Sequence, residues 1–388
     1  MILLAVILLL GAGCLDPVDI EGYGYVISLG IDELDGGELY FTFMLQRESA
    51  DSAGSSDGGA SIIAEKGANI YDAINRLEGR IPFVLDFSRM NFMFIGEKAA
   101  KDGMIKGIMG ENLESLRVRL SAVVMVCEPD ASTVIGGLAA NNDANITKLQ
   151  SAITQDKYLT GMVSVTTLSR MLEACNEGRF DICSALGSYD ETIITDMKQK
   201  KSEEDGEDPL KDAEKGQSIG GLQSGATGSA LFDGWVMTGK LDRRETMLLN
   251  IAAGEFKEGE LLLDTERFGT VTLQFRIISN NTEVTGIYDN GADFLIKVRL
   301  YATVRTIGTG ADKDEISSWL QDEASELIEA ELEKVFLKCR EASCDAARLG
   351  TALSKRFTSA ESWEQYDWKE KYKNSQVSFR VELTEPAK

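Results

Sequence analysis

The stretch FGTVTLQFRIISNNTEVTGIYDNGADFLIKVRLYATVRTI, residues 268–307, indicates the fold most clearly. In its first half Val271, Leu273 and Phe275 alternate with polar residues, and a second alternating run extends from Leu295 to Val304. Alternation with a period of two is typical of strands that bury one face. The stretch therefore predicts two long β-strands.

A long amphipathic helix is predicted from Asp314 to Arg340, shortly after these strands. Residues at helical spacing form one apolar stripe, namely Ile316, Leu320, Ala324, Leu327, Leu332, Val335 and Cys339. An aromatic helical segment, SWEQYDWKEKY, and a final strand, SQVSFRVEL, follow. Strands with a long covering helix predict an α+β C-terminal domain over residues 265–388.

Helix and strand patterns mix through residues 14–195, which we expect to form an N-terminal α/β domain. A β-hairpin is predicted from Tyr23–Ile31 and Glu38–Gln46, because both segments alternate and an Asp-Gly-Gly turn signal separates them. Further strands are predicted in RMNFMFIG and LRVRLSAVVMVCEP. Further helices are predicted over residues 69–79, 97–110, 131–138 and 165–177.

A charged, aromatic-free segment extends over residues 196–225. Because it has few large apolar side chains to bury, we expect a solvated linker or long loop. Residues 226–264 follow as a small middle module. Within it, GSALFDGWVMTGKL predicts a hairpin with its turn near Asp233 and Gly234, and a helix comes next.

The first 13 residues form an uncharged apolar run that stops at Cys14. The run is too short to cross a bilayer as a helix, which needs ~20 apolar residues, but it matches the apolar region of a secretory signal. Gly11, Ala12 and Gly13 supply the small residues that a lipoprotein signal peptidase recognises before a cysteine. We therefore expect a signal peptide over residues 1–13 and a diacylglycerol on the Cys14 thiol. The alternative is a plain secretory signal with a structural cysteine.

Composition excludes several classes of function. The formal net charge of −23 argues against a nucleic-acid partner, because phosphates require a basic face. The sequence has no histidine, which excludes Ser-His-Asp, Cys-His and His-metal catalysis. Cys175 with Cys183, and Cys339 with Cys344, are candidate disulfides, but we expect mostly free, buried thiols.

Several segments resemble the Ger(x)C spore-germination proteins, which are the lipoprotein C subunits of germinant receptors in endospore-forming bacteria. CLDPVDIEGYGYVISLGID, residues 14–32, resembles the family's mature start, although Leu15 stands where tryptophan is usual. DFSRMNFMFIGEKAAKDG, residues 86–103, resembles the family's strand, its turn at Gly96 and Glu97, and its next helix. Arg89 stands where the family often has histidine.

The rest of the chain continues this resemblance. The segment GSALFDGWVMTGKL and the end CDAARLGTALSKRFTSAESWEQYDWKEKYKNSQVSFRVEL are similar to the family's middle and last segments. In that end, Asp345, Gly350, Trp363 and Trp368 match the family's aspartate, glycine and paired tryptophans.

The resemblance implies a three-domain body of mixed β-sheets flanked by helices. It also implies that lipid on Cys14 holds this body on the outer face of the spore's inner membrane. The implied partners are two transmembrane receptor subunits that help to detect amino acids, sugars or nucleosides. The family carries no established catalytic residue, so the resemblance transfers none.

Several charged residues have both a functional and a structural interpretation. Glu97 is a candidate receptor contact, but we favour an acid stabilised by a helix N-terminus. Arg117 and Arg119 lie at strand spacing and are candidates for meeting acidic partners, although a solvated or ion-paired face is more usual. Glu203 and Glu204 are interpreted as solvating the linker, not as catalytic carboxylates.

The aromatic segment near the C-terminus has two interpretations as well. Trp363, Tyr366, Trp368 and Tyr372 are residue types enriched at protein interfaces. We expect the first three to pack the helix onto its sheet instead.

We expect a non-enzymatic receptor subunit without catalytic residue, metal or cofactor. One alternative is a solute-binding lipoprotein of a transporter, which requires a cleft between two doubly wound lobes that the β-rich C-terminal end does not suggest. The other is an extracytoplasmic hydrolase that acts through paired carboxylates, which the lack of histidine leaves open. The neighbouring genes distinguish the receptor subunit from the transporter lipoprotein. Genes for two membrane subunits of the germination type support the first, and genes for an ATPase and a permease support the second.

Replacement of Cys14 tests the anchor. Cys14→Ala should release the protein from the membrane fraction, because it removes the attachment point of the acyl chains. Fractionation of cells that lack the partner subunits measures this release. Equal membrane retention of the variant and the unchanged chain would contradict lipidation at Cys14.

Overall fold

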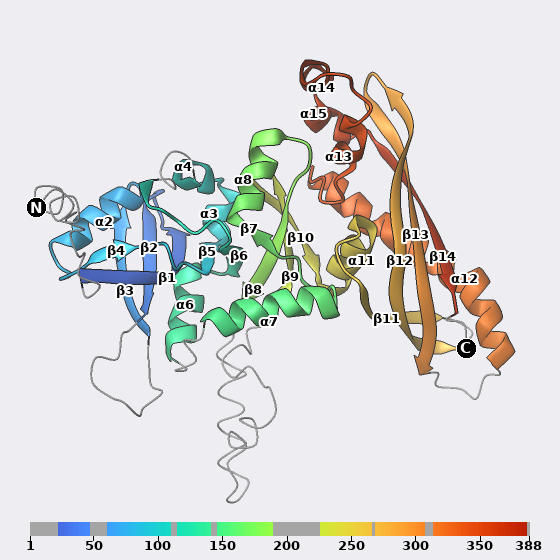
Figure 1. The fold of residues 1–388 in the computed structure, drawn as a ribbon, viewed down its shortest axis with the longest axis horizontal. Helices are drawn as coiled ribbons and strands as arrows, with labels where there is room; N and C mark the ends of the chain where they lie inside the picture. Colours follow the sequence, from blue (N-terminus) through green and yellow to red (C-terminus); the bar gives the residue numbers. More distant parts are fainter. Residues whose placement is uncertain are drawn as a thin grey trace, which may run out of the picture.

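The structure, a computed structural model, describes residues 22–46, 60–109, 115–140, 146–188, 226–265, 268–306 and 313–385. The predicted signal peptide, Cys14 and the predicted linker over residues 196–225 lie outside the described residues. Two β-sheets with helices packed against them lie side by side along the long axis of the molecule (Figure 1). Mixed sheets flanked by helices confirm the predicted α+β class.

The first sheet contains ten strands in the order β10-β9-β8-β6-β5-β1-β2-β3, with β4 paired to β1 and β7 to β6. Its central strands β8, β6, β5 and β1 are parallel, and antiparallel pairs extend it on both sides. The strands are β1 (Tyr23–Glu33), β2 (Leu39–Gln46), β3 (Ala60–Gly67), β4 (Val84–Asp86), β5 (Phe92–Gly96), β6 (Val123–Glu128), β7 (Thr166–Thr167), β8 (Cys183–Ser188), β9 (Ala226–Asp233) and β10 (Val236–Asp242).

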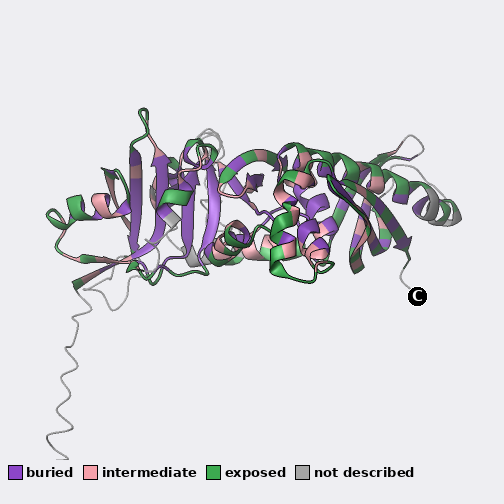
Figure 2. Ribbon diagram, turned by 90° about the horizontal axis from the view of Figure 1, so that it is seen from above, coloured by how far each residue is buried: buried purple, intermediate pink, exposed green. Residues whose placement is uncertain are grey.

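Helices cover both faces of the first sheet, so most side chains of its central strands are apolar and buried. In β5, Phe92 and Phe94 pack on one face and Met93 and Ile95 on the other, and all four side chains are fully buried. The helices of this part are α2 (Ile70–Glu78), α3 (Glu97–Lys101), α4 (Ile105–Met109), α6 (Ala131–Ala140), α7 (Ile146–Leu159) and α8 (Leu168–Glu177). Figure 2 shows the central strands of the first sheet as almost wholly buried.

The second sheet has the order β11-β12-β13-β14, formed by β11 (Glu258–Thr265), β12 (Gly269–Tyr288), β13 (Gly291–Thr306) and β14 (Gln376–Thr384). All its pairs are antiparallel except β13 with β14. The long helix α12 (Lys313–Glu341) packs beside β14, and Glu329 Oε1 accepts the backbone N–H of Val381 on this edge strand at 2.7 Å. The edge strand is thereby partly covered, which limits unwanted pairing with other chains.

Helix α11 (Arg243–Ala253) connects the two sheets. Its residues 246–252 are buried in succession, as expected of a helix with protein on every side. One hydrophobic core contains side chains of β9, β10, α11, the second sheet and the C-terminal helices. The remaining helices are α13 (Leu349–Ser354), α14 (Ala360–Tyr366) and α15 (Trp368–Tyr372).

Most predicted elements form close to their expected bounds, including both hairpins and the two long strands of the C-terminal part. The hairpin of the predicted middle module forms as β9 and β10, and β9 pairs with β8, so both strands extend the first sheet. The domain boundaries proposed from the sequence remain predictions. Among the helices of the described residues, none has both the length and the apolarity that crossing a bilayer requires.

Two sequence-based expectations were wrong in detail, and one helix was missed. The strand predicted from Leu116 begins only at Val123, because Arg117 has a left-handed backbone with φ of 52° that interrupts an extended chain. Helix α7 was not predicted. In α12, Leu327 is 36% exposed and Ile328 is buried instead, whereas Leu320, Ala324, Leu332, Val335 and Cys339 are buried as predicted.

The start of α11 yields a stability prediction. Asp242 accepts the N–H of Glu245 at 2.8 Å and Glu245 accepts the N–H of Asp242 at 3.0 Å, forming a capping box. Asp242→Ala should lower the free energy of unfolding by about 1 kcal/mol, because the helix loses an acceptor for its first N–H groups. Urea unfolding measures this change, with Asp35→Ala in the exposed β1–β2 turn as a control. Equal midpoints for both variants would contradict it.

Candidate functional site

The candidate site lies where the loop before α13 meets the beginning of β8, between the two sheets. Asp345 is 1% exposed, and its carboxylate accepts three hydrogen bonds. These come from the backbone N–H of Leu349 at 2.8 Å, the N–H of Gly350 at 2.7 Å and Trp368 Nε1 at 3.0 Å. The side chain therefore fixes the start of α13 and the position of α15 together.

Asp181, just before β8, joins this network to the first sheet. Its carboxylate accepts the backbone N–H of Asp345 at 3.0 Å, and its own N–H donates to the Asp345 carbonyl at 3.2 Å. The same carboxylate accepts the N–H of Gly234 in the β9–β10 turn at 3.1 Å. Strand β8, the hairpin and the C-terminal segment are thereby held at one point.

Lys369 on α15 completes the contact between the C-terminal segment and the first sheet. Its Nζ is bonded to Asp181 and lies 2.7 Å from Asp233 Oδ1. Burial acts to lower the pKa of Lys369, but the two carboxylates outweigh it and the pKa is raised. The ammonium is therefore held in its charged form between two acidic partners.

Gly350 is required by the close approach of its neighbours. A Cβ atom at this position would lie 2.3 Å from the carbonyl oxygen of Arg179 and 2.4 Å from Trp368 Nε1. Side chains do not approach so closely, so only glycine allows α13 to pack against the loop before β8 and against Trp368. Asp345, Gly350 and Trp368, matched to the family from sequence, thus form one structural unit.

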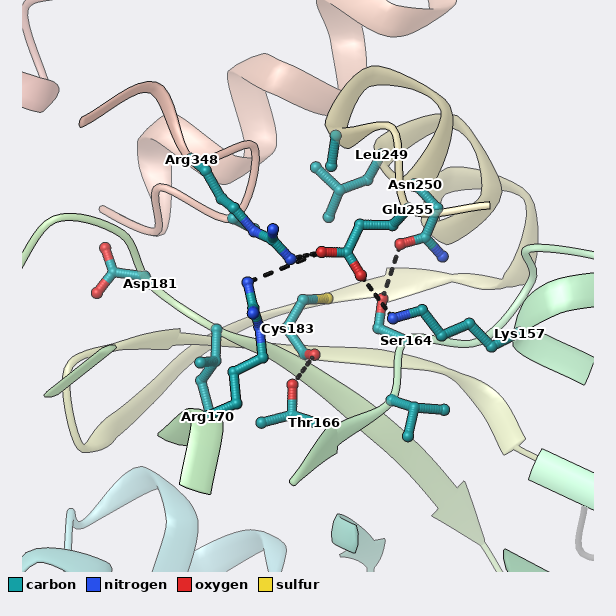
Figure 3. Close-up of a pocket in the computed structure, with 14 residues that line it drawn as sticks. Lys157, Ser164, Thr166, Arg170, Asp181, Cys183, Leu249, Asn250, Glu255 and Arg348 are labelled. Carbon is teal, nitrogen blue, oxygen red and sulfur yellow. Dashed lines mark hydrogen bonds and ion pairs between the residues drawn. The ribbon is translucent and has the colours of Figure 1, made fainter. Parts of the chain in front are cut away.

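A second feature of the junction is a small charged cavity (Figure 3). It encloses about 30 Å³ and is lined by residues of α7, α8, β8, α11 and the loop before α13. Glu255 projects into it and forms ion pairs with Lys157 at 2.5 Å, Arg170 at 3.8 Å and Arg348. One carboxylate thus faces three cations.

Burial lowers the pKa of all three cations, Lys157, Arg170 and Arg348. For Arg348 burial comes first and the charge of Arg170 second, and together they lower the pKa to about 10. Arg348 also has a left-handed backbone with φ of 61°, an unfavourable conformation for a residue with a side chain.

The carboxyl ends of the parallel strands, where ligands of α/β sheets usually bind, are filled by the chain's own contacts. Asp32 at the end of β1 accepts the N–H groups of Ala131 and Ser132 at 2.7 and 2.9 Å. Glu97 lies at the start of α3, as expected, and pairs with Lys101 at 2.5 Å and Lys240 at 2.7 Å. This edge of the sheet serves to position α6 and β10.

Several other described residues that were singled out from the sequence have structural roles. Trp363 and Trp368 are 8% and 3% exposed, so they pack in the core as predicted. Arg119 donates to the Asn91 side chain at 3.0 Å. Within the described residues the cysteines are free thiols, as expected, namely Cys127, Cys175, Cys183, Cys339 and Cys344.

No local pattern in the sequence predicts the charged cavity. Lys157 belongs to α7, which was not predicted although Ile146, Leu149 and Ile153 have helical spacing. Arg170, Glu255 and Arg348 are too far apart in the chain for any local pattern to connect them.

Comparison with known proteins agrees with the resemblance seen in the sequence. Residues 16–184 match the family model described as spore germination protein N-terminal domain. Residues 227–384 match the model described as spore germination B3/GerAC like, C-terminal. A search of the curated proteins found no match.

The fold is also similar to a solved structure, described as the crystal structure of the GerBC protein. The two share 13% sequence identity with a TM-score of 0.54, and the match covers 92% of this chain and 97% of that one. At this identity the likeness concerns the fold alone.

The Asp345 network predicts a pH dependence of stability. Burial raises the pKa of Asp345 from 3.8 to about 7 against the hydrogen bonds that lower it. At a pH between 3.8 and about 7, Asp345 keeps its proton in the folded state but has lost it in the unfolded state. The free energy of unfolding should therefore fall as pH rises through this range. The slope is up to about 1.4 kcal/mol per pH unit.

Urea unfolding of Asp345→Asn between pH 4 and 8 measures this contribution. The variant should be less stable by about 1–3 kcal/mol, because an amide replaces one acceptor with a donor. Its stability should also lack the Asp345 slope, whereas Asp35→Asn should retain it. Identical slopes for all three proteins would contradict a raised pKa at Asp345.

Proposed function

Because the chain belongs to the Ger(x)C family of spore germination proteins, we propose that it is a lipid-anchored, non-enzymatic subunit of a germinant receptor. In this role it is needed for the germination response to small-molecule nutrients. The observation that carries the proposal is the pair of family matches, which extend over residues 16–184 and 227–384 and so include both sheets.

The proposed location is the outer face of the spore's inner membrane, with two transmembrane receptor subunits as partners. A diacylglycerol on Cys14 is the proposed anchor. Strand β1 begins at Tyr23, nine residues after Cys14. Nine residues reach at most ~30 Å, so such an anchor keeps the first sheet close to the bilayer and to partners within it.

The geometry of the buried acids supports a role without catalysis. A carboxylate-dependent hydrolase needs acids that a substrate can reach. Asp345 is instead fully enclosed by three N–H donors, and Asp181 is 6% exposed and bound to Lys369. These acids stabilise the junction.

The architecture also differs from that expected of a transporter's solute-binding lipoprotein. Such a protein would place a cleft between two doubly wound lobes. Here the first sheet has a parallel centre, whereas three of the four strands of the second sheet are antiparallel neighbours. The two halves are therefore not a pair of similar lobes.

Deletion of the gene tests the proposal. Spores without it should lose the response to one class of germinant, and vegetative growth should be unchanged. Germination is followed by the fall in optical density after nutrient addition, with complementation by the intact gene. Asp35→Ala should complement fully, because an exposed turn carboxylate has no part in the proposed role.

Two results would contradict the proposal. One is normal germination of the deletion spores with every nutrient class. The other is turnover of a peptidoglycan or ester substrate by the purified chain, with loss of that activity after a single Glu→Gln change, which would favour the hydrolase.

A further inference from the structure

The charged cavity at the junction contains more positive than negative charge. Lys157, Arg170 and Arg348 line it and share the carboxylate of Glu255. The other acid of the lining, Asp181, is already paired with Lys369. This excess occurs in a chain with a formal net charge of −23, which has many acids available for pairing.

Arg170 is the cation with the weakest protein partner. Its guanidinium lies 3.8 Å from Glu255, beyond hydrogen-bond distance, and 4.9 Å from the ring centre of Phe180. Among the described residues its side chain makes no hydrogen bond to a protein acceptor. The charge of Arg170 lowers the pKa of Arg348, which is a sign that the two guanidinium groups repel each other, and the exposed carboxylate of Glu173 offsets only part of the positive charge.

The neutral polar groups around the cavity are already satisfied. Asn250 Nδ2 donates to the carbonyl of Gly161 at 2.7 Å, and Ser164 Oγ donates to Asn250 Oδ1 at 3.3 Å. Thr166 Oγ1 donates to the carbonyl of Cys183 at 2.8 Å. The donors left for a further acceptor are therefore the cationic ones.

We propose that this cavity binds a small oxyanion, which Arg170, Arg348 and Lys157 hold beside Glu255. Guanidinium groups bind oxyanions through pairs of parallel hydrogen bonds, and a buried anion offsets repulsion among buried cations. About 30 Å³ exceeds the space of one water, ~10–15 Å³, and suits an inorganic oxyanion or the carboxylate of a small molecule. It is far below the ~300 Å³ of a pocket for a whole drug-sized ligand.

The position of Glu255 makes binding competitive. Glu255 follows Gly254, the residue that ends α11, so its side chain belongs to the connection between α11 and β11. An incoming oxyanion and the Glu255 carboxylate attract the same cations and repel each other. Ligand binding is thereby linked to the connection between the two sheets, and this inference stands independently of the proposed receptor role.

Isothermal titration calorimetry with the purified full chain tests the proposal, using sodium phosphate and sodium acetate at constant ionic strength. Saturable binding of one anion per chain is expected. Phosphate binding without acetate binding identifies an inorganic oxyanion as the ligand class, and binding of both identifies carboxylates as well. Heat that does not saturate with either anion would overturn the proposal.

Three variants make the test specific. Arg170→Gln should weaken binding at least tenfold, while its thermal midpoint without added anion stays equal or rises, because repulsion with Arg348 is relieved. Glu255→Gln should bind about tenfold more tightly, because the competing carboxylate is gone. Arg276→Gln is the matched control, since Arg276 is an exposed arginine on β12 paired with Glu258, and should bind as the unchanged chain does.

The outcome of these variants is decisive in either direction. Unchanged affinity in Arg170→Gln would overturn the proposal, as would weaker binding in Glu255→Gln. If Glu255 only held the junction together, Glu255→Gln would lower the thermal midpoint without any gain in anion affinity.

Discussion

A buried carboxylate on the C-terminal segment, Asp345, holds the two sheets of this protein together. It accepts hydrogen bonds from the start of α13 and from Trp368, and its backbone pairs with Asp181 beside the first sheet. Leaving any of these N–H groups unpaired in the interior would cost roughly 1–3 kcal/mol. The same contact brings Gly350 so close to Arg179 and Trp368 that no side chain fits at this position.

The junction combines neutralised and unbalanced charge in a small volume. Asp181, Asp233 and Lys369 form a closed set in which the ammonium has two acidic partners. The neighbouring cavity has the opposite arrangement, since three cations face the single carboxylate of Glu255. The first set holds α15 against the first sheet, and the second is the proposed anion site.

Local patterns in the sequence were sufficient for most strands and for α12, because alternation and helical spacing report burial directly. They also led to Asp345, Gly350 and Trp368 through the family resemblance, although not to the contacts among them. The cavity could not be predicted from the sequence, because residues 157, 170, 255 and 348 meet only after both sheets have packed. The strand expected from Leu116 was wrong because alternating residues cannot reveal the left-handed backbone of Arg117.

The most direct test of the central claim is to identify the proteins that accompany this chain in spore membranes. A tagged chain would be purified from detergent-solubilised inner membranes, and its companions identified and quantified by mass spectrometry. The account predicts two polytopic membrane subunits of the germination type in amounts comparable to the chain. Recovery of an ATPase and a permease, or of no stoichiometric companion, would contradict it.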